Sequence, residues 1–303
     1  MIHFMLNKCF FCSSVSIRET PLRRRIKWDS RIFQYFLCKE CGGLSLYPKL
    51  NAEDIGKLYS KEYNSDPNQK AKSHEDYLAN HGYKYSLNLL KDLTSTHRLL
   101  DFGCGMDQTI SNFVKSKGAK YTGVEVDYDV VEFLRGRTTS NEYLTLKEFF
   151  QTKDKFDFIF CGDVFEHIVN PIDVLMNLTE YLKPQGYLLI QGPLENSRTI
   201  SHGLVKLKSL LLNQKEKFQS PYHVSLARRS SMISLLHETN LTLVRMMSYE
   251  VWWPMERAYP HKSSRNKRSL LYFSKIIDIS LARIFPKYGN RFCLIARLEN
   301  LNS

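Results

Sequence analysis

The chain has 303 residues, of which 43% are hydrophobic and 24% charged, a balance that excludes a largely disordered protein. No window approaches about 18 uninterrupted apolar residues, and the start of the chain lacks the pattern of a secretory signal, so we expect no transmembrane segment and a cytoplasmic location. The formal net charge of +12 is concentrated at 18–31 and 255–290 and favours an anionic partner. A solvated basic surface without a specific partner is the alternative.

Residues 1–50 contain two C-x-x-C pairs, Cys9 with Cys12 and Cys38 with Cys41. Four thiolates suit a tetrahedral zinc ion, and disulfides are rare in a reducing cytosol. A segment of this size has too small a core to fold without such a clamp. We therefore expect a zinc ribbon-like module with a structural Zn²⁺. Redox-active or simply buried cysteines are the alternative.

The rest of the chain divides into a linker and a main domain. Residues 51–96 are polar and rich in tyrosine, with helical character at Glu53–Tyr59 and Tyr77–Leu93, and we expect a helical linker or cap. Residues 97–303 are expected to form the main domain, with the cofactor-binding core at 97–195 and a substrate-side insertion and sheet closure at 196–303.

Within 97–195, strand-like segments alternate with helix-like ones, which predicts a parallel sheet covered by helices. The expected strands are Arg98–Phe102, Lys120–Glu125, Phe156–Cys161 and Tyr187–Ile190. Helices are expected from Thr109 to the turn at Gly118, after an N-cap at Asp127, and from Asn170-Pro171 to a stop at Pro184 and Gly186.

A glycine turn follows the first of these strands. Gly103 and Gly105 let the backbone turn sharply against a ligand, and Glu125 ends the next strand, where a carboxylate can accept ribose hydroxyls. The third glycine of a dinucleotide fingerprint is absent. Asp101 would repel a pyrophosphate but suits the amino group and sulfonium of S-adenosylmethionine. The charge therefore favours the methyl donor over a dinucleotide.

Four stretches of the core resemble the class I S-adenosylmethionine-dependent methyltransferases, in the branch that includes ubiquinone-biosynthesis O-methyltransferases. They are LLDFGCG (99–105), YTGVEVD (121–127), FDFIFCGDVFEHIVNP (156–171) and LKPQGYLLI (182–190). The resemblance implies an α/β, Rossmann-like, seven-stranded sheet that is mostly parallel with an antiparallel last strand. Leu241–Tyr249 and Asn290–Arg297 would supply strands six and seven.

The resemblance also implies cofactor contacts. Asp101, Gly103 and Gly105 would line the methionine end, Glu125 would bind the ribose, and Gly162 would offer backbone near the sulfonium. Two positions depart from the family. Asp107 stands where a third glycine is frequent, and either weakens cofactor binding or points to solvent. The acid that contacts adenine is not evident, and Glu148 is a candidate.

The first 60 residues resemble the zinc-binding segment that precedes some bacterial methyltransferases, including sugar C-methyltransferases. The matching features are the C-x-x-C pairs, Leu44–Pro48, Leu58-Tyr59 and Glu62-Tyr63.

Methyl transfer is an in-line displacement that depends mainly on alignment, and a hydroxyl or carbon acceptor can also need a base. The candidates are His223, His167 and Asp163; an orienting role is the alternative for His167. Cys104 and Cys161 are expected to be packing residues. Trp252-Trp253 is expected in the core, with stacking on a sugar or base as the alternative. The [DN]-P-P-[YF] motif of adenine or guanine N-methylation is absent.

Three functions remain open. The favoured one is methylation of a small molecule or a glycan or nucleotide-sugar intermediate, with an anionic acceptor. The second is methylation of RNA, gripped by the zinc module and by Arg23, Arg24 and Arg25. The third is a non-catalytic adaptor, or peripheral membrane contact through the basic amphipathic stretch 270–285, which is preceded by Arg265, Lys267 and Arg268. For that stretch, packing on the domain is favoured.

Overall fold

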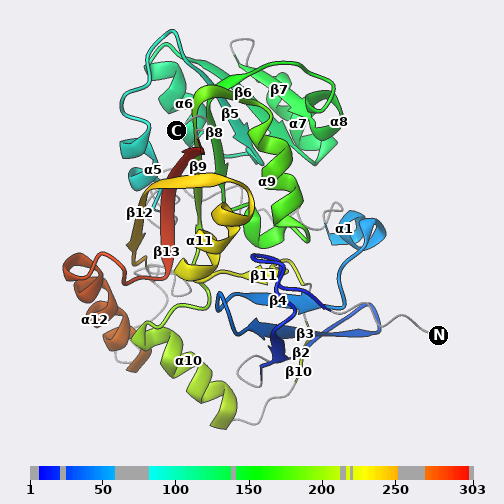
Figure 1. Ribbon diagram of the computed structural model, residues 1–303, viewed down its shortest axis with the longest axis vertical. Helices are drawn as coiled ribbons and strands as arrows, with labels where there is room; N and C mark the ends of the chain where they lie inside the picture. The colour runs from blue at the N-terminus through cyan, green and yellow to red at the C-terminus, as the bar shows by residue number, and fades with distance from the viewer. Residues whose placement is uncertain are drawn as a thin grey trace.

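A computed structural model describes residues 7–20, 25–58, 82–137, 141–211, 216–218, 221–251 and 270–299. These residues form two sheets, a large one flanked by helices and a smaller one beside it (Figure 1). The helix expected at Tyr77–Leu93 is described from residue 82 onward, where α5 covers Tyr83–Leu89. Arg23, Arg24, Trp252, Trp253 and the basic residues at 265–268 lie outside the described part of the chain.

The large sheet has seven strands in the order β12-β13-β9-β8-β5-β6-β7. Strand β13 is antiparallel to both of its neighbours, whereas the pairs from β9 to β7 are parallel. The strands are β5 (Arg98–Phe102), β6 (Lys120–Glu125), β7 (Glu142–Thr145), β8 (Phe156–Gly162), β9 (Leu182–Pro193), β12 (Leu241–Tyr249) and β13 (Arg291–Leu298). The predicted fold, an α/β sheet of seven strands with the last one antiparallel, is confirmed.

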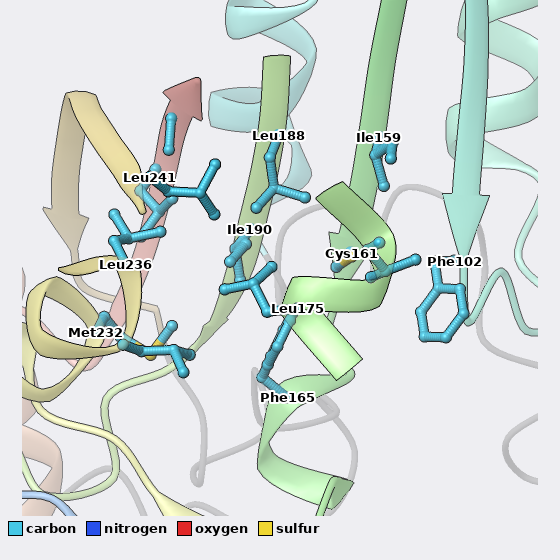
Figure 2. Packing of buried hydrophobic residues seen from close by; sticks show 14 of the residues in the cluster. Phe102, Ile159, Cys161, Phe165, Leu175, Leu188, Ile190, Met232, Leu236 and Leu241 are labelled. Atoms are coloured by element: carbon cyan, nitrogen blue, oxygen red, sulfur yellow. The ribbon is translucent and has the colours of Figure 1, made fainter. Parts of the chain in front are cut away.

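Helices cover both faces of this sheet. One face packs against α5, α6 (Thr109–Ser116) and α7 (Tyr128–Arg135). The other packs against α8 (Leu146–Phe149), α9 (Pro171–Thr179) and α11 (Arg229–Glu238). Figure 2 shows the second core, where Leu175 of α9 and Met232 of α11 point toward Ile190 of β9. Because both faces are covered, the central strands are almost wholly apolar.

The ends of the helices follow local rules. The Asp127 side chain accepts hydrogen bonds from the backbone N–H groups of Asp129 and Val130, which caps α7 as expected. The third predicted helix is shorter than expected, because α9 ends at Thr179 and strand β9 already begins at Leu182. Leu182 pairs with Phe156, and the proline at 184 favours an extended residue before it.

The small sheet combines distant parts of the sequence. Its order is β10-β2-β3-β4-β11, and β1 pairs with β3. The strands are β1 (Ile17–Glu19), β2 (Arg25–Trp28), β3 (Arg31–Cys38), β4 (Leu44–Tyr47), β10 (Glu216–Phe218) and β11 (Ser225–Leu226). Helix α1 (Ala52–Leu58) follows β4. Two strands from the second half of the chain thus complete a sheet that begins in the cysteine-containing segment.

Three further elements complete the described chain: the 3-10 turn η1 (Phe165–His167), α10 (Ile200–Leu211) and α12 (Leu270–Ile284). Among the described helices, none combines the length and the apolar character needed to cross a bilayer.

Candidate active site

The turn after β5 brings two glycines with left-handed backbone to the carboxyl edge of the sheet. Gly103 has φ 76° and Gly105 has φ 53°. A Cβ at Gly103 would lie 2.5 Å from Cγ2 of Val164, so the fold itself requires glycine there. A Cβ at Gly105 would meet nothing within 4 Å. Gly105 therefore faces open space at the edge where ligands bind in doubly wound sheets.

Two carboxyl groups flank this turn. Asp101 is buried at the end of β5 and accepts a hydrogen bond of 2.9 Å from the hydroxyl of Tyr121. Burial, with smaller contributions from the charges of Glu125 and Asp107, raises the pKa of Asp101 to about 7. A cation bound beside Asp101 would stabilise its ionised form.

Glu125 closes the other side of the turn. Its Oε2 accepts the N–H of Gly105 at 2.9 Å, and its Oε1 accepts the N–H of Val126 at 2.7 Å. Burial raises the pKa of Glu125, and these backbone hydrogen bonds oppose that shift. The carboxylate thus lies directly against the glycine turn, one strand away from Asp101.

The two residues that depart from the family pattern both serve helix ends. Oδ1 of Asp107 accepts the N–H of Thr109 at 2.7 Å, at the start of α6. Glu148 forms a capping box with Thr145 at the start of α8 and pairs with Arg135. Both side chains therefore have local structural partners.

Gly162, at the end of β8, lies under an aromatic cover. A Cβ there would fall 2.6 Å from a ring carbon of Phe160 and 3.0 Å from the hydroxyl oxygen of Tyr83. Tyr83 comes from α5, so this helix contributes to the covering of the carboxyl edge.

His167 and His223, far apart in the sequence, meet beyond β8 and β9. Their rings lie 4.9 Å apart in an edge-to-face arrangement. Nδ1 of His223 is 2.6 Å from Oε2 of Glu195, and Nδ1 of His167 is 2.9 Å from the carbonyl oxygen of Tyr222. Both imidazoles are thus oriented through Nδ1.

The protonation states of this cluster differ sharply. Burial disfavours the charged form of His223, but the charge and hydrogen bond of Glu195 outweigh it and raise the pKa of His223 to about 9. Burial and the neighbouring charge of His223 lower the pKa of His167 to about 4. Burial and the charge of Asp163 raise the pKa of Glu166 to about 8. Near neutral pH, the cluster therefore holds an imidazolium, a neutral imidazole and a neutral carboxyl group.

Asp163 lies directly after β8 with a positive φ of 57° and forms an ion pair with Arg291, the first residue of β13. Oδ2 of Asp163 and Nε of Arg291 are buried with no hydrogen-bond partner among the described residues. These two buried atoms thus retain unused hydrogen-bonding capacity.

One donor atom each from Glu166, His167 and His223 lie within 4.8 Å of one another. Two imidazoles and a carboxylate can bind a divalent cation. The same three groups can equally bind a polar acceptor.

The four cysteines of the two C-x-x-C pairs converge in the small sheet. Their sulfur atoms all lie within 4.8 Å of one another, with Cys9–Cys41 at 3.5 Å and Cys12–Cys38 at 3.6 Å. Tetrahedral zinc with Zn–S bonds of the usual length separates its sulfurs by about 3.8 Å. The contact with Cys41 lowers the pKa of Cys9 to about 6, whereas burial raises that of Cys12 to about 12.

Backbone N–H groups around these thiols donate to the sulfur atoms. The N–H groups of Phe11, Cys41 and Gly43 point at the sulfurs of Cys9, Cys38 and Cys41 over 3.4–3.5 Å. Gly42 has φ 73°, as a tight turn requires. The thiols and their turns therefore fit a four-coordinate structural ion.

The isolated cysteines near the glycine turn behave as packing residues. Cys104 and Cys161 are buried in the two cores that flank the large sheet. Burial raises the pKa of both thiols well above the usual value, so neither is a ready nucleophile.

Sequence reasoning missed three residues that contact His223 or Asp163: Glu195, Arg291 and Tyr35. Glu195 follows β9, and a carboxylate just beyond a buried strand is a usable signal. Arg291 directly precedes an apolar run at 292–296, which is a second signal. Tyr35 of β3 donates a hydrogen bond of 2.5 Å to the carbonyl oxygen of His223, a contact between distant segments that no local pattern announces.

Sheet order, glycine turn and flanking carboxyl groups define the class I S-adenosylmethionine-dependent methyltransferases. A family described as "Methyltransferase domain" matches residues 71–246, more than half of the chain. The chain belongs to this family and is an S-adenosylmethionine-dependent methyltransferase.

Individual relatives are more distant. The ubiquinone biosynthesis O-methyltransferase of Histophilus somni is 29% identical over 102 residues, which cover 30% of this chain and 42% of that protein. The (S)-coclaurine N-methyltransferase of Papaver somniferum is 25% identical over 100 residues, covering 31% of this chain and 28% of that protein. The chain thus matches less than half the length of these curated relatives. The plantazolicin methyltransferase BpumL, solved with SAH, is 17% identical and covers 81% of this chain and 94% of that structure, with a TM-score of 0.48.

Proposed function

We propose that the enzyme methylates an anionic small molecule, a glycan or a nucleotide-sugar intermediate by in-line transfer. The observation that carries this proposal is the pair formed by Glu195 and the partly exposed His223, which meets His167 beyond the ends of β8 and β9. A base held at the carboxyl edge is what a hydroxyl or carbon acceptor requires.

In the proposed cofactor site, Asp101, Gly103 and Gly105 line the methionine end, Glu125 binds the ribose and Gly162 lies near the sulfonium. The bound cofactor supplies a methyl group on a positively charged sulfur. The buried carboxyl of Asp101 would balance that charge, and the open space at Gly105 would admit the ligand next to the backbone. Glu125 would exchange its hydrogen bond with Gly105 for ribose hydroxyls.

His223 is the proposed base. In its neutral form, Nε2 takes the proton of the acceptor as the acceptor atom bonds to the methyl carbon and the carbon–sulfur bond breaks. The proton remains on the imidazole, where Glu195 stabilises it. His167 orients the acceptor through its neutral ring, and Asp163 holds Arg291 at the rim of the pocket.

We further propose a structural Zn²⁺ on Cys9, Cys12, Cys38 and Cys41, supported by the convergence of the four sulfurs. With four protein ligands, no position remains for water or substrate. The ion would fix the turns of the small sheet and take no part in methyl transfer.

The RNA alternative depends on free basic groups near the cysteines. Arg25 pairs with Glu19, and Arg31 pairs with the buried carboxylate of Asp54. These ion pairs reduce the positive charge offered to phosphates by the described part of this region.

The test is methyl transfer from S-adenosylmethionine to a panel of nucleotide sugars, phosphorylated sugars and RNA, read by mass spectrometry. We expect a methylated nucleotide sugar or sugar phosphate. For that acceptor, we expect His223→Asn to lower kcat roughly 100-fold or more while calorimetry shows unchanged cofactor binding. His237→Asn, on the exposed side of α11, is the matched control and should retain full activity. Methylation of RNA alone, or full activity in His223→Asn, would contradict the proposal.

A further inference from the structure

Helix α12 buries two charged residues while several of its large apolar residues are exposed. Lys275 and Asp278 are 1% and 0% exposed, whereas Leu270, Phe273 and Ile277 are 69%, 54% and 48% exposed. A helix packed on a soluble domain normally shows the opposite pattern. The inversion therefore indicates that something apolar covers the outer face.

Specific contacts fix this orientation. The carboxylate of Asp278 accepts the N–H groups of Ile200 and Ser201 at 2.9 and 2.8 Å, at the start of α10. Lys275 forms a buried ion pair with Glu250, just after β12. Turning α12 over would bury its apolar side but would expose or break these paired charges, which is costly. The apolar face is thus held outward.

The exposed apolar surface extends over two helices. Helices α10 and α12 contact each other and lie side by side at one end of the molecule (Figure 1). The α10–α12 apolar face consists of exposed residues that share one side of each helix: Ile200 and Leu207 of α10, and Leu270, Phe273, Ile277 and Ile284 of α12. Exposed apolar patches mark sites of protein or membrane interaction.

The charge around this face identifies the occupant. Asp278 is the one acidic residue in 270–287, and it is buried; α10 has no acidic residue. Arg283 and Lys287 are exposed, and the sequence places Arg265, Lys267 and Arg268 just before α12. Two copies docked face to face would bring like charges together. An anionic lipid surface offers apolar depth for the exposed side chains and negative charge for the basic ones.

We propose that the α10–α12 apolar face docks on an anionic membrane surface, with both helices lying in the interface. Helix α10 follows the end of β9, and α12 precedes β13, whose first residue Arg291 pairs with Asp163. The face therefore begins at the same edge of the sheet as the proposed acceptor pocket. Docking would bring that pocket to the bilayer, where a lipid-linked acceptor is presented. This inference concerns where the enzyme acts and goes beyond the proposed reaction.

The test is flotation of the full chain with phosphatidylcholine vesicles that contain phosphatidylglycerol. We expect binding that weakens as salt rises, and little binding to phosphatidylcholine alone. Phe273→Ser combined with Ile277→Ser should weaken binding roughly 10-fold or more, because two inserted side chains are lost. Phe133→Ser combined with Ile233→Ser is the matched control: it changes one phenylalanine and one isoleucine exposed on α7 and α11.

Circular dichroism and cofactor binding check that both double variants fold. The proposal is overturned if the wild-type chain does not float with anionic vesicles, or if the α12 variant floats as well as the control. It is also overturned if light scattering shows a dimer that the α12 variant abolishes, because the occupant would then be a second copy. None of these measurements requires methyl transfer, so their outcome is independent of the acceptor's identity.

Discussion

The hydrogen bond between His223 and Glu195 controls when the proposed base is available. Since the pKa of His223 is raised to about 9, its ring carries a proton below that pH and accepts one only above it. We expect kcat/KM to rise as the pH rises through about 9. Glu195→Gln removes the charge that stabilises the imidazolium, so the rising limb should move to lower pH by roughly one unit or more.

The measurement is the pH–rate profile of both proteins under matched cofactor saturation. Glu238→Gln on α11 removes an acidic residue elsewhere and should leave the profile in place. A rising limb that stays at the same pH in Glu195→Gln would show that Glu195 does not set the protonation of the base.

The two glycines after β5 should differ in what their substitution changes: stability at Gly103 and cofactor binding at Gly105. Gly103→Ala would bring its Cβ to 2.5 Å from Val164, so we expect a loss of roughly 1–3 kcal/mol of stability. In Gly105→Ala the added Cβ contacts no protein atom, so the loss of stability comes only from the left-handed backbone conformation and is about 1 kcal/mol. Its methyl group would instead enter the proposed cofactor space, and calorimetry should show S-adenosylmethionine affinity reduced by roughly 10-fold or more. Equal affinity in Gly105→Ala and the wild type would place the cofactor elsewhere.

The residue types of the cofactor turn could be predicted from the sequence because adjacent residues form it. The partners of Asp107 and Glu148 could not, since each side chain can either cap a helix or face a ligand. In the structure both side chains accept or share hydrogen bonds at the start of a helix, Asp107 at α6 and Glu148 at α8. The partner of His223 was also out of reach, because Glu195 lies on a different loop.

At the scale of elements, the alternation of strand-like and helix-like segments predicted four strands of the large sheet, and β6 covers Lys120–Glu125 as expected. The family resemblance implied β12 and β13, and β12 covers Leu241–Tyr249. Strand β7 was not predicted. Strand β11 was missed because Ser225–Leu226 is too short to carry a pattern. Its strand character comes from pairing with Ser45 and Leu44 of β4, about 180 residues earlier in the chain.

Helix α12 shows a different limit of sequence reasoning. The spacing of apolar residues predicted an amphipathic helix, and it also favoured packing of that helix on the domain. The helix does pack, but through Lys275 and Asp278 rather than through its apolar side. Only the distant positions of Glu250 and the start of α10 decide which face turns inward.

At the scale of the whole molecule, the cysteine-containing segment is joined to the acceptor side of the main domain. The side chain of Asn196 donates to the carbonyl oxygen of Gly42 at 2.8 Å, and that of Ser230 donates to the carbonyl oxygen of Cys41 at 2.6 Å. Tyr35 binds the backbone of His223 in the same way. The predicted domain boundaries at residues 50 and 96 stay a prediction. These contacts nevertheless connect the cysteine turns to the loops that hold Glu195 and His223.

Removal of the proposed zinc ion should therefore affect catalysis at a distance. Without the ion, the turns that carry the carbonyl groups of Cys41 and Gly42 would no longer be held together. The hydrogen bonds from Asn196 and Ser230 to these carbonyl groups would then weaken. We expect chelation, or Cys38→Ser, to lower the melting temperature and to reduce kcat roughly 10-fold or more, because alignment dominates in-line transfer. Affinity for S-adenosylmethionine should change little, since the glycine turn follows β5 and makes none of these contacts.

Metal content, melting temperature, kcat and cofactor binding are measured together. Cys293→Ala, which changes a buried cysteine outside the cluster, is the control and should retain the metal. Restoration of kcat by added Zn²⁺ would support the coupling, whereas a metal-free enzyme with unchanged kcat and stability would show that the cysteine turns hold without an ion.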